Sequence, residues 1–67
     1  MVDVTGKEIK EGMCVELEYY GGGGVGILVC EQNGVLGFMS GYFNPEFFPL
    51  AEIKLGETVA SIRITKE

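Results

Sequence analysis

Apolar and acidic residues alternate along the segment MCVELEYY near the start of the chain. Val15, Leu17 and Tyr19 fall on one side of an extended backbone, and Glu16 and Glu18 fall on the other. A period of two residues is the signature of a strand with one buried face. This segment is therefore predicted to be a strand whose two glutamates form a solvated face.

The next apolar run, VGILVCEQ over residues 25–32, is apolar on both sides. Val25, Ile27 and Val29 share one face, and Leu28 and Cys30 share the other. A strand with two apolar faces is typically covered on both of them. We expect this strand to be covered on both sides, either by a helix or by another subunit.

Two further strands follow from turn signals and alternation. Asn33 and Gly34 stand between apolar runs, and this dipeptide favours a tight hairpin turn with positive φ at both residues. A third strand is expected at 35–40, where Gly37 indicates close backbone approach or a bend. The last strand is expected at 57–65, with three residues facing the core: Ala60, Ile62 and Ile64.

The segment GYFNPEFFPLAEIKLG carries helix signals. Asn44 is a good N-cap, Pro45 suits a first helical position and Gly56 is a natural stop. Pro49 would lie inside such a helix and disrupt it. We predict a distorted turn at 45–48 and a short helix at 49–54, which pack four residues on the sheet: Phe47, Phe48, Leu50 and Ile53.

These elements predict a single α+β domain spanning residues 1–67. Its sheet is mainly antiparallel, the order is strand, strand, strand, helix, strand, and the one short helix packs on the sheet. Gly21, Gly23 and Gly26 match the spacing G-x-G-x-x-G of dinucleotide-binding loops, but a strand pattern follows them where that motif needs a helix. A glycine-rich hairpin loop is the favoured interpretation.

Length and composition favour oligomerisation. A chain of 67 residues buries only about 60% of its unfolded surface and needs a supplement to its core. The chain has no histidine and two cysteines, which excludes a Cys and His zinc site. A disulfide between Cys14 and Cys30, on neighbouring strands, is conceivable but not indicated, and we expect both to be small buried hydrophobes. Association with other copies is the favoured supplement.

Charge limits the partners and the compartment. Ten acidic and five basic residues give a net charge of −5, which opposes binding to a nucleic-acid backbone. The first ten residues lack the pattern of a signal peptide, and no apolar run is long enough to cross a membrane. We therefore expect a cytoplasmic protein that binds neither nucleic acid nor membrane.

The stretch GFMSGYFN holds the candidate ligand site. If a strand ends at Ser40 and a helix begins at Asn44, the turn at Gly41 exposes backbone amides that can hold an anion or an oxyanion. The spacing differs from a nucleophile elbow, and no histidine is present to activate the serine. A purely structural turn is favoured over a site. No cofactor or metal is expected.

The aromatic residues allow two interpretations. They either form a ligand cage or divide between the core and an interface patch, and the second is more usual. The set has seven members: Tyr19, Tyr20, Phe38, Tyr42, Phe43, Phe47 and Phe48.

At NGVLGFMSGYFN the chain resembles the YunC-like family, a prokaryotic domain of unknown function. Gly34, Met39, Gly41 and Asn44 fit that family's pattern of a turn glycine, an apolar strand ending Met-Cys-Gly, and a short run to an Asn or Asp that opens a helix. The family's cysteine is replaced by Ser40, which argues against thiol chemistry. The resemblance implies an N-terminal β region used for tetramerisation, and it implies no known reaction.

The preferred hypothesis is a non-enzymatic homo-oligomer, a dimer or tetramer, with a role in assembly or ligand binding. The first alternative is a small enzyme with a site near Ser40 and Asn44 at a subunit junction. Without histidine, such a site has only carboxylates or Lys54 as a general base. The second alternative is a protein-interaction module that uses a sheet edge or an aromatic patch.

Overall fold

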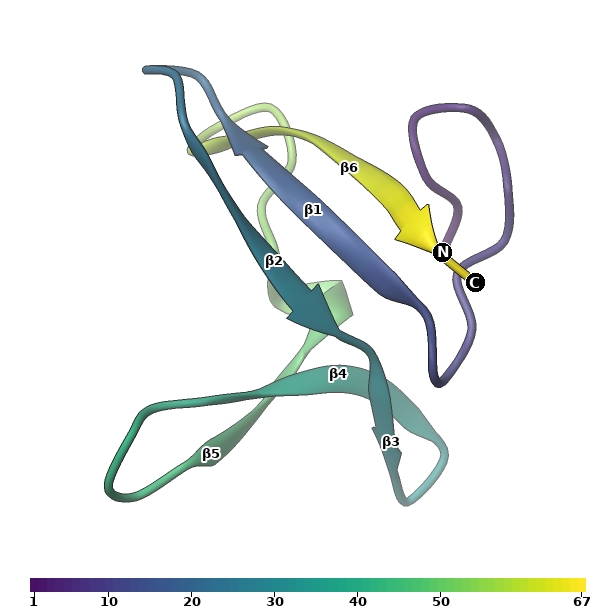
Figure 1. Cartoon of the computed structure of the whole chain (residues 1–67), viewed down its shortest axis with the longest axis vertical. Coiled ribbons are helices and arrows are strands. Elements are labelled where there is room, and N and C mark those ends of the chain that lie inside the picture. Colours follow the sequence, from purple (N-terminus) through teal and green to yellow (C-terminus); the bar gives the residue numbers. More distant parts are fainter.

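The fold consists of two small antiparallel sheets and one turn of 3-10 helix. The computed structural model describes residues 1–67 (Figure 1). One sheet has the strand order β2-β1-β6, and the other has the order β3-β4-β5. The elements are β1 (Cys14–Tyr19), β2 (Gly24–Leu28), β3 (Cys30–Gln32), β4 (Val35–Ser40), β5 (Glu46–Pro49), the 3-10 turn η1 (Leu50–Glu52) and β6 (Val59–Lys66).

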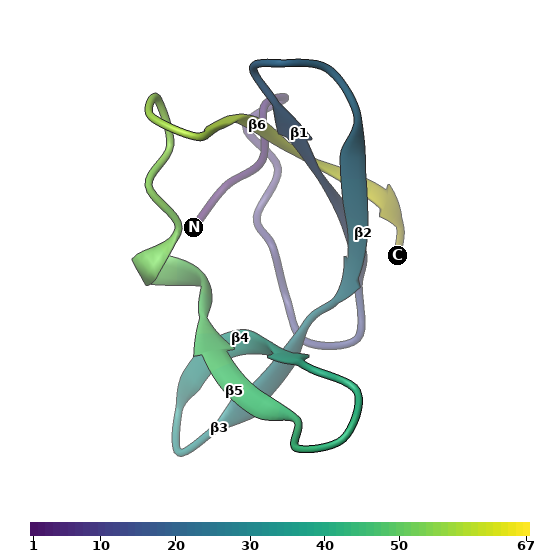
Figure 2. The ribbon, with the colours of Figure 1, turned by 90° about the vertical axis from the view of Figure 1, so that its left-hand side faces the viewer.

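Strands β2 and β3 are two parts of one apolar run that bends at Val29. The side chain of Val29 is buried, and its amide donates a hydrogen bond of 2.9 Å to the carbonyl of Met13. The bend carries the chain from the first sheet into the second, and the two sheets lie at an angle to one another (Figures 1 and 2). The single strand expected at 25–32 is therefore divided between two sheets.

The predicted α+β class is wrong, because the molecule is almost entirely β and has no α-helix. Residues 46–49 form strand β5, and only Leu50–Glu52 turn, as a 3-10 segment. Pro49 explains the difference, since it has φ −65° and ψ 137°, an extended conformation. A proline also biases the preceding residue, Phe48, away from helix. The helix signals at Asn44, Pro45 and Gly56 act as turn signals instead.

The core lies mainly against the first sheet. Seven hydrophobic residues are buried in one cluster: Ile9, Val15, Leu17, Val29, Leu50, Val59 and Ile62. Strand β1 supplies two of them at alternate positions, as its pattern predicts. No α-helix covers the sheet, so Leu50 reaches the core from η1 and Ile53 packs against it just beyond.

Strand β6 departs from simple alternation. Glu18 lies opposite Ser61 while Tyr19 lies opposite Val59, so Ala60 is an extra residue in the ladder. Such a β-bulge changes which residues face inward. Val59 and Ile62 are buried and Ala60 is exposed, which corrects the expectation that Ala60 faces the core; Ile64 packs at the margin of the core.

The turn glycines serve the backbone as expected. Asn33 and Gly34 have φ values of 52° and 81°, which fit a tight hairpin turn between β3 and β4. The glycines at 21–23 connect the antiparallel strands β1 and β2. At Gly37 the neighbouring strand β5 comes so close that a side chain does not fit. A Cβ there would lie 2.5 Å from the Phe47 ring and 2.3 Å from the Phe48 carbonyl oxygen.

The first residues of the chain cover the outer edge of β6. The amide of Val4 donates to the carbonyl of Ile62 at 2.8 Å, and the amide of Ile64 donates to a carboxylate oxygen of Asp3 at 3.0 Å. This edge of the first sheet is thus hydrogen-bonded within the chain.

The structure has no helix of the length and apolarity that crossing a bilayer requires.

Candidate functional site

Ser40, Gly41 and Asn44 belong to one hairpin connection. Ser40 ends β4 opposite Glu46 of β5, and the loop 41–45 joins the two strands. Gly41 has φ 111°, and a Cβ there would lie 3.2 Å from the Asn44 carbonyl oxygen, so the loop backbone closes tightly at that point. The structure therefore brings the three predicted residues together, and all three are exposed.

The geometry lacks the helix on which the anion hypothesis depends. Asn44 precedes a strand, so no helix N-terminus offers its amides and its partial positive charge. The residue opposite Ser40 is the acidic Glu46, which repels an anion. The side chains of Ser40 and Asn44 make no hydrogen bond. Ligand binding at these three residues stays a prediction.

The molecule offers no enclosed site of another kind. Its surface has no pocket, and no three acidic or cysteine side chains converge as a metal site would require. Small-molecule sites are usually concave, with a few polar groups placed around an apolar cavity. The surface features that need an explanation are therefore the exposed apolar ones.

The outward side of the second sheet is apolar. Leu36 and Phe38 of β4 turn inward toward the core, so the alternate positions turn outward. Strand register places residues of β3 and β5 on the same outward side. We call this surface the apolar face; it consists of Cys30, Val35, Gly37, Met39, Phe47 and Pro49.

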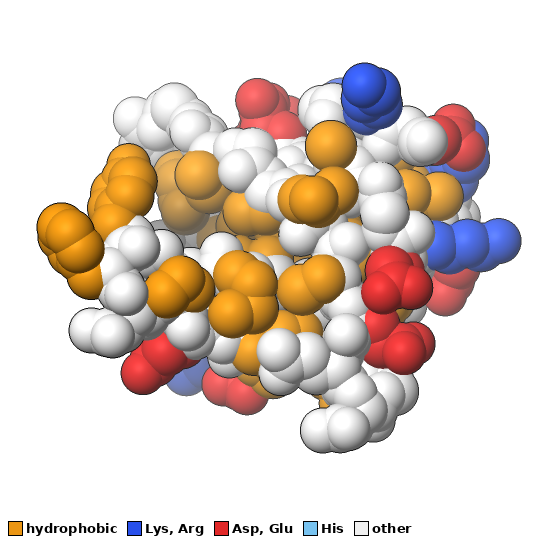
Figure 3. All heavy atoms as spheres, turned by 60° about the horizontal axis from the view of Figure 1, so that its bottom comes forward, with side chains coloured by type: hydrophobic (Ala, Val, Ile, Leu, Met, Phe, Trp, Pro, Cys, Tyr) orange, Lys and Arg blue, Asp and Glu red, His pale blue; other side chains and the backbone are white.

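The apolar face carries no charged side chain. The polar Gln32 borders this face, since it lies opposite Val35 and contacts the sulfur of Met39. The side chains of Val35 and Met39 are 44% and 49% exposed. Figure 3 shows apolar side chains gathered on this side of the molecule, with charged side chains mostly around its margin.

The loop beside the apolar face carries two bare aromatic rings. Tyr42 is 99% exposed and Phe43 is 97% exposed. Both belong to the connection 41–45, which we call the aromatic loop and which projects from the body of the fold (Figure 1). Aromatic rings left in water at the tip of a hairpin are typical of protein interfaces.

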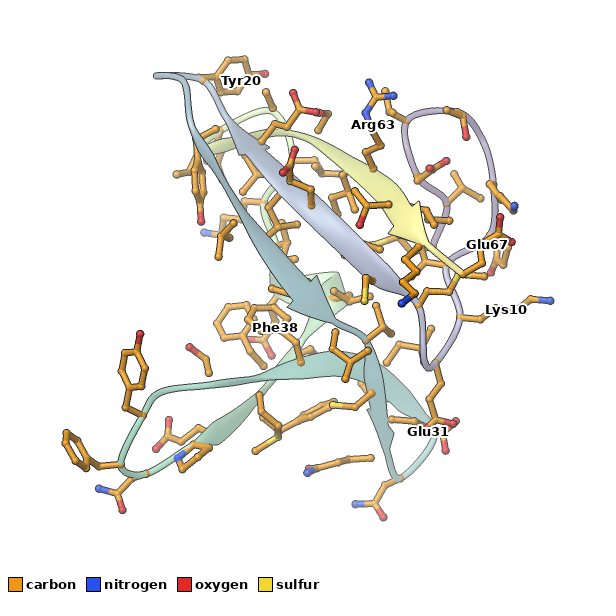
Figure 4. The ribbon with its side chains drawn as sticks, viewed as in Figure 1. Lys10, Tyr20, Glu31, Phe38, Arg63 and Glu67 are labelled. Carbon is orange, nitrogen blue, oxygen red and sulfur yellow. The ribbon has the colours of Figure 1, made fainter.

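The aromatic residues do not form one cage. Phe38 points between the two sheets, and its ring centroid lies 5.4 Å from that of Phe48 (Figure 4). Phe47 lies on the opposite side of the same sheet, across Gly37. Tyr20 lies at the far end of β1 (Figure 4). The set therefore divides between a partly buried pair and exposed patches.

The outward side of the first sheet is charged. Glu16 and Glu18 of β1 alternate with the buried Val15 and Leu17, and Nε of Arg63 lies 3.5 Å from a carboxylate oxygen of Glu18. A charged sheet face is stable in water and resists association with another acidic molecule. The two sheets thus present opposite kinds of surface.

Asp3 is an anchor that the sequence analysis missed. One carboxylate oxygen accepts hydrogen bonds from the amides of Thr5 and Lys7 at 2.9 and 3.0 Å, and from the Thr5 hydroxyl at 2.6 Å. The Thr5 hydroxyl and then the Ile64 amide hold the pKa of this carboxyl far below its ordinary value. The Asp-x-Thr spacing is the one local signal for this turn.

The cysteines are not paired. Cys14 lies in β1 of the first sheet and Cys30 lies in β3 of the second, and both thiols are free. Both side chains are half-buried, so neither is the fully buried hydrophobe that we expected.

Comparison with known proteins adds no relative. No family model, no curated protein and no solved structure matches the chain. The resemblance to the YunC-like family therefore stays a prediction.

Proposed function

We propose that this chain is a non-enzymatic assembly domain that forms a homo-oligomer, a dimer or a tetramer. The observation that carries the proposal is the apolar face together with the adjoining aromatic loop. These surfaces place Met39, Tyr42 and Phe43 in water although the chain has a small core. Burial of such side chains is the main driving force of protein association.

The lack of charge on this surface allows a second acidic copy to occupy it. Two molecules of net charge −5 repel one another, and contact through an uncharged surface minimises that repulsion. The accessible surface of the chain is 4615 Å² for a mass of 7.3 kDa, whereas a compact monomer of that mass exposes about 4,200 Å². The chain therefore exposes somewhat more surface than an average monomer of its mass.

The exposed area suits a small interface. Tyr42 and Phe43 each offer nearly a whole ring, and aromatic side chains bury about 200 Å² apiece. Met39 and Val35 of the apolar face add to that area. A standard interface takes about 800 Å² from each partner, so the apolar face and the aromatic loop together supply a large share of one.

The two alternatives to homo-oligomeric assembly are not equally supported by the structure. A protein-interaction module would use the same exposed surface for a different chain, and it is therefore the second candidate. The enzyme hypothesis near Ser40 and Asn44 has no specific observation behind it. The cytoplasm is the proposed compartment.

The experiment is light scattering on the eluate of a size-exclusion column. We expect the natural chain to elute at a multiple of 7.3 kDa, and the double variant Met39→Lys with Phe43→Ser to have a lower mass. Leu55→Lys is the matched control, because Leu55 is as exposed as Met39 but lies outside the apolar face. A monomeric natural chain at 100 µM would refute the assembly proposal, and unchanged mass in the double variant would remove the apolar face from it.

A further inference from the structure

Strand β2 is an open edge of the first sheet. The strand order β2-β1-β6 leaves β2 paired on one side only. The other edges are protected: the N-terminal residues cover β6, β5 follows Pro45 and ends at Pro49, and β3 has only three residues and carries the charged Glu31. Natural proteins usually blunt an open edge with charges, prolines or bulges. The sequence of β2, GVGIL, has none of these.

The hydrogen-bond pattern identifies the backbone groups on this edge. The amide of Tyr19 donates to the Gly23 carbonyl at 3.1 Å, and the amide of Val29 donates to the Met13 carbonyl at 2.9 Å. Antiparallel ladders bond alternate residues, so odd-numbered residues from 23 to 29 bond toward β1. The amides and carbonyls of Gly24, Gly26 and Leu28 therefore point away from the sheet.

Gly26 has no role inside the chain that requires glycine. Its φ is not positive, and a Cβ at this position would meet no atom within 4 Å. Gly24 differs, since a Cβ there would lie 2.6 Å from the Leu17 carbonyl oxygen. Glycine inside a strand often marks a bulge, a bend, or a site where a ligand or another backbone approaches closely, and the last of these fits an open edge. Gly26 stands at the middle of the open edge.

We infer that β2 pairs antiparallel with β2 of a second copy, with the twofold axis between the two Gly26 residues. In this register Gly24 lies opposite Leu28 of the partner subunit, and Val25 lies opposite Ile27 of the partner subunit. The outward groups of Gly24, Gly26 and Leu28 then bond to the same three residues of the second copy. The two first sheets become one continuous sheet of six strands. This inference rests on the proposed assembly function and names a specific interface for it.

The strand is complementary to itself in size and charge. Each Leu28, 61% exposed in the single chain, lies beside a glycine of the other copy, and Val25, 41% exposed, gains an apolar neighbour. The nearest acidic rows, on the two β1 strands, are three strand spacings apart, about 14 Å. That separation exceeds the screening length of about 8 Å at physiological salt. An extended segment of another protein would lack this built-in match.

The test is disulfide trapping at the proposed axis. Gly26→Cys is placed in a background with Cys14→Ser and Cys30→Ser, and the protein is oxidised at micromolar concentration. The axis places the two Gly26 Cα atoms about 5.5 Å apart, within disulfide range. We expect a crosslinked dimer to form at least ten times faster than with Lys10→Cys, an exposed control in the same background.

A second variant separates this interface from the apolar face. Leu28→Lys places a charge beside the partner strand, and we expect it to lower the mass in light scattering while Leu55→Lys does not. An oligomer that keeps its mass with Leu28→Lys and gives no faster crosslink at position 26 overturns the β2 inference and leaves the assembly proposal standing. A natural chain that is monomeric at 100 µM overturns both.

Discussion

The two sheets of this small domain use their apolar residues in opposite ways. The first sheet supplies four of the seven buried core residues, and its outward side carries glutamates and an arginine. The second sheet supplies none of the seven, and its inward Leu36 and Phe38 are only partly buried. Its outward Met39 and Val35 lie in water. The first sheet packs its apolar residues into the core, whereas the second sheet leaves much of its apolar surface exposed.

The difference separates stability from association. Residues of the first sheet stabilise the fold within one chain, because their burial removes apolar surface from water. The outward Val35 and Met39 are about half exposed and contribute less to folding, so their apolar character needs another cause. Contact with a second copy is the cause that we propose.

The largest expected difference comes from truncating one apolar residue in each sheet to alanine. Leu17→Ala removes a buried side chain from β1, and such truncations lower the free energy of unfolding by about 2–5 kcal/mol. Met39→Ala removes a half-exposed side chain, and in the isolated chain it changes that free energy by less than about 1 kcal/mol. Urea denaturation at a low protein concentration measures both. If the two variants lost equal amounts of unfolding free energy, the distinction between a core-forming first sheet and an exposed second sheet would be contradicted.

A smaller effect is expected at the covered edge of the first sheet. The pKa of Asp3 is lowered from 3.8 in the folded chain, so its carboxylate stabilises the fold above the unfolded pKa. That stabilisation decreases progressively as the pH falls from about 4 toward the lower pKa of the folded chain. Asp3→Asn should therefore lower the melting temperature more at pH 7 than at pH 3.

Calorimetry at the two pH values measures this difference. Glu11→Gln serves as a control, because Glu11 is exposed in the turn before β1 and makes no hydrogen bond. If the difference in melting temperature between the natural chain and Asp3→Asn grows toward pH 3, the ionised Asp3 carboxylate is not what stabilises this edge.

The smallest effect compares two glycines of β2. Gly24→Ala brings a Cβ against the Leu17 carbonyl, and such overpacking costs about 1–3 kcal/mol. Gly26→Ala meets open space, and a tolerated Gly→Ala change raises stability by about 0.4–1 kcal/mol. Denaturation of both variants at low protein concentration gives the two signs. A destabilising Gly26→Ala would show that this glycine serves the single chain, which removes one support for the β2 interface.

The sequence predicted the elements whose signals are local. Alternation at Val15 and Leu17 and the turn at Asn33 and Gly34 require only neighbouring residues, and both agree with the structure. The close approach at Gly37 was also foreseen. The helix predicted at 49–54 does not form as an α-helix, because Asn44 and Gly56 suit turns as well as helix ends. Pro49, which the sequence places inside the expected helix, is extended and prevents it.

The remaining features depend on distant contacts. The bend at Val29 and the bulge at Ala60 follow from how strands meet in three dimensions, which no local period reveals. Asp3 accepts a hydrogen bond from Ile64, a residue 61 positions away. The candidate turn at Ser40, Gly41 and Asn44 was placed correctly between elements. The anion site proposed at this turn depends on a helix that begins at Asn44, and no such helix forms.

Sedimentation equilibrium of the unmodified chain over a hundredfold range of concentration, at low and high salt, tests the assembly claim most directly. We predict a mass that rises with concentration to a multiple of 7.3 kDa. Association should be as strong or stronger in high salt, because salt screens repulsion between acidic copies and leaves apolar contact intact. A mass of one chain at every concentration, or association that salt abolishes, would contradict the account.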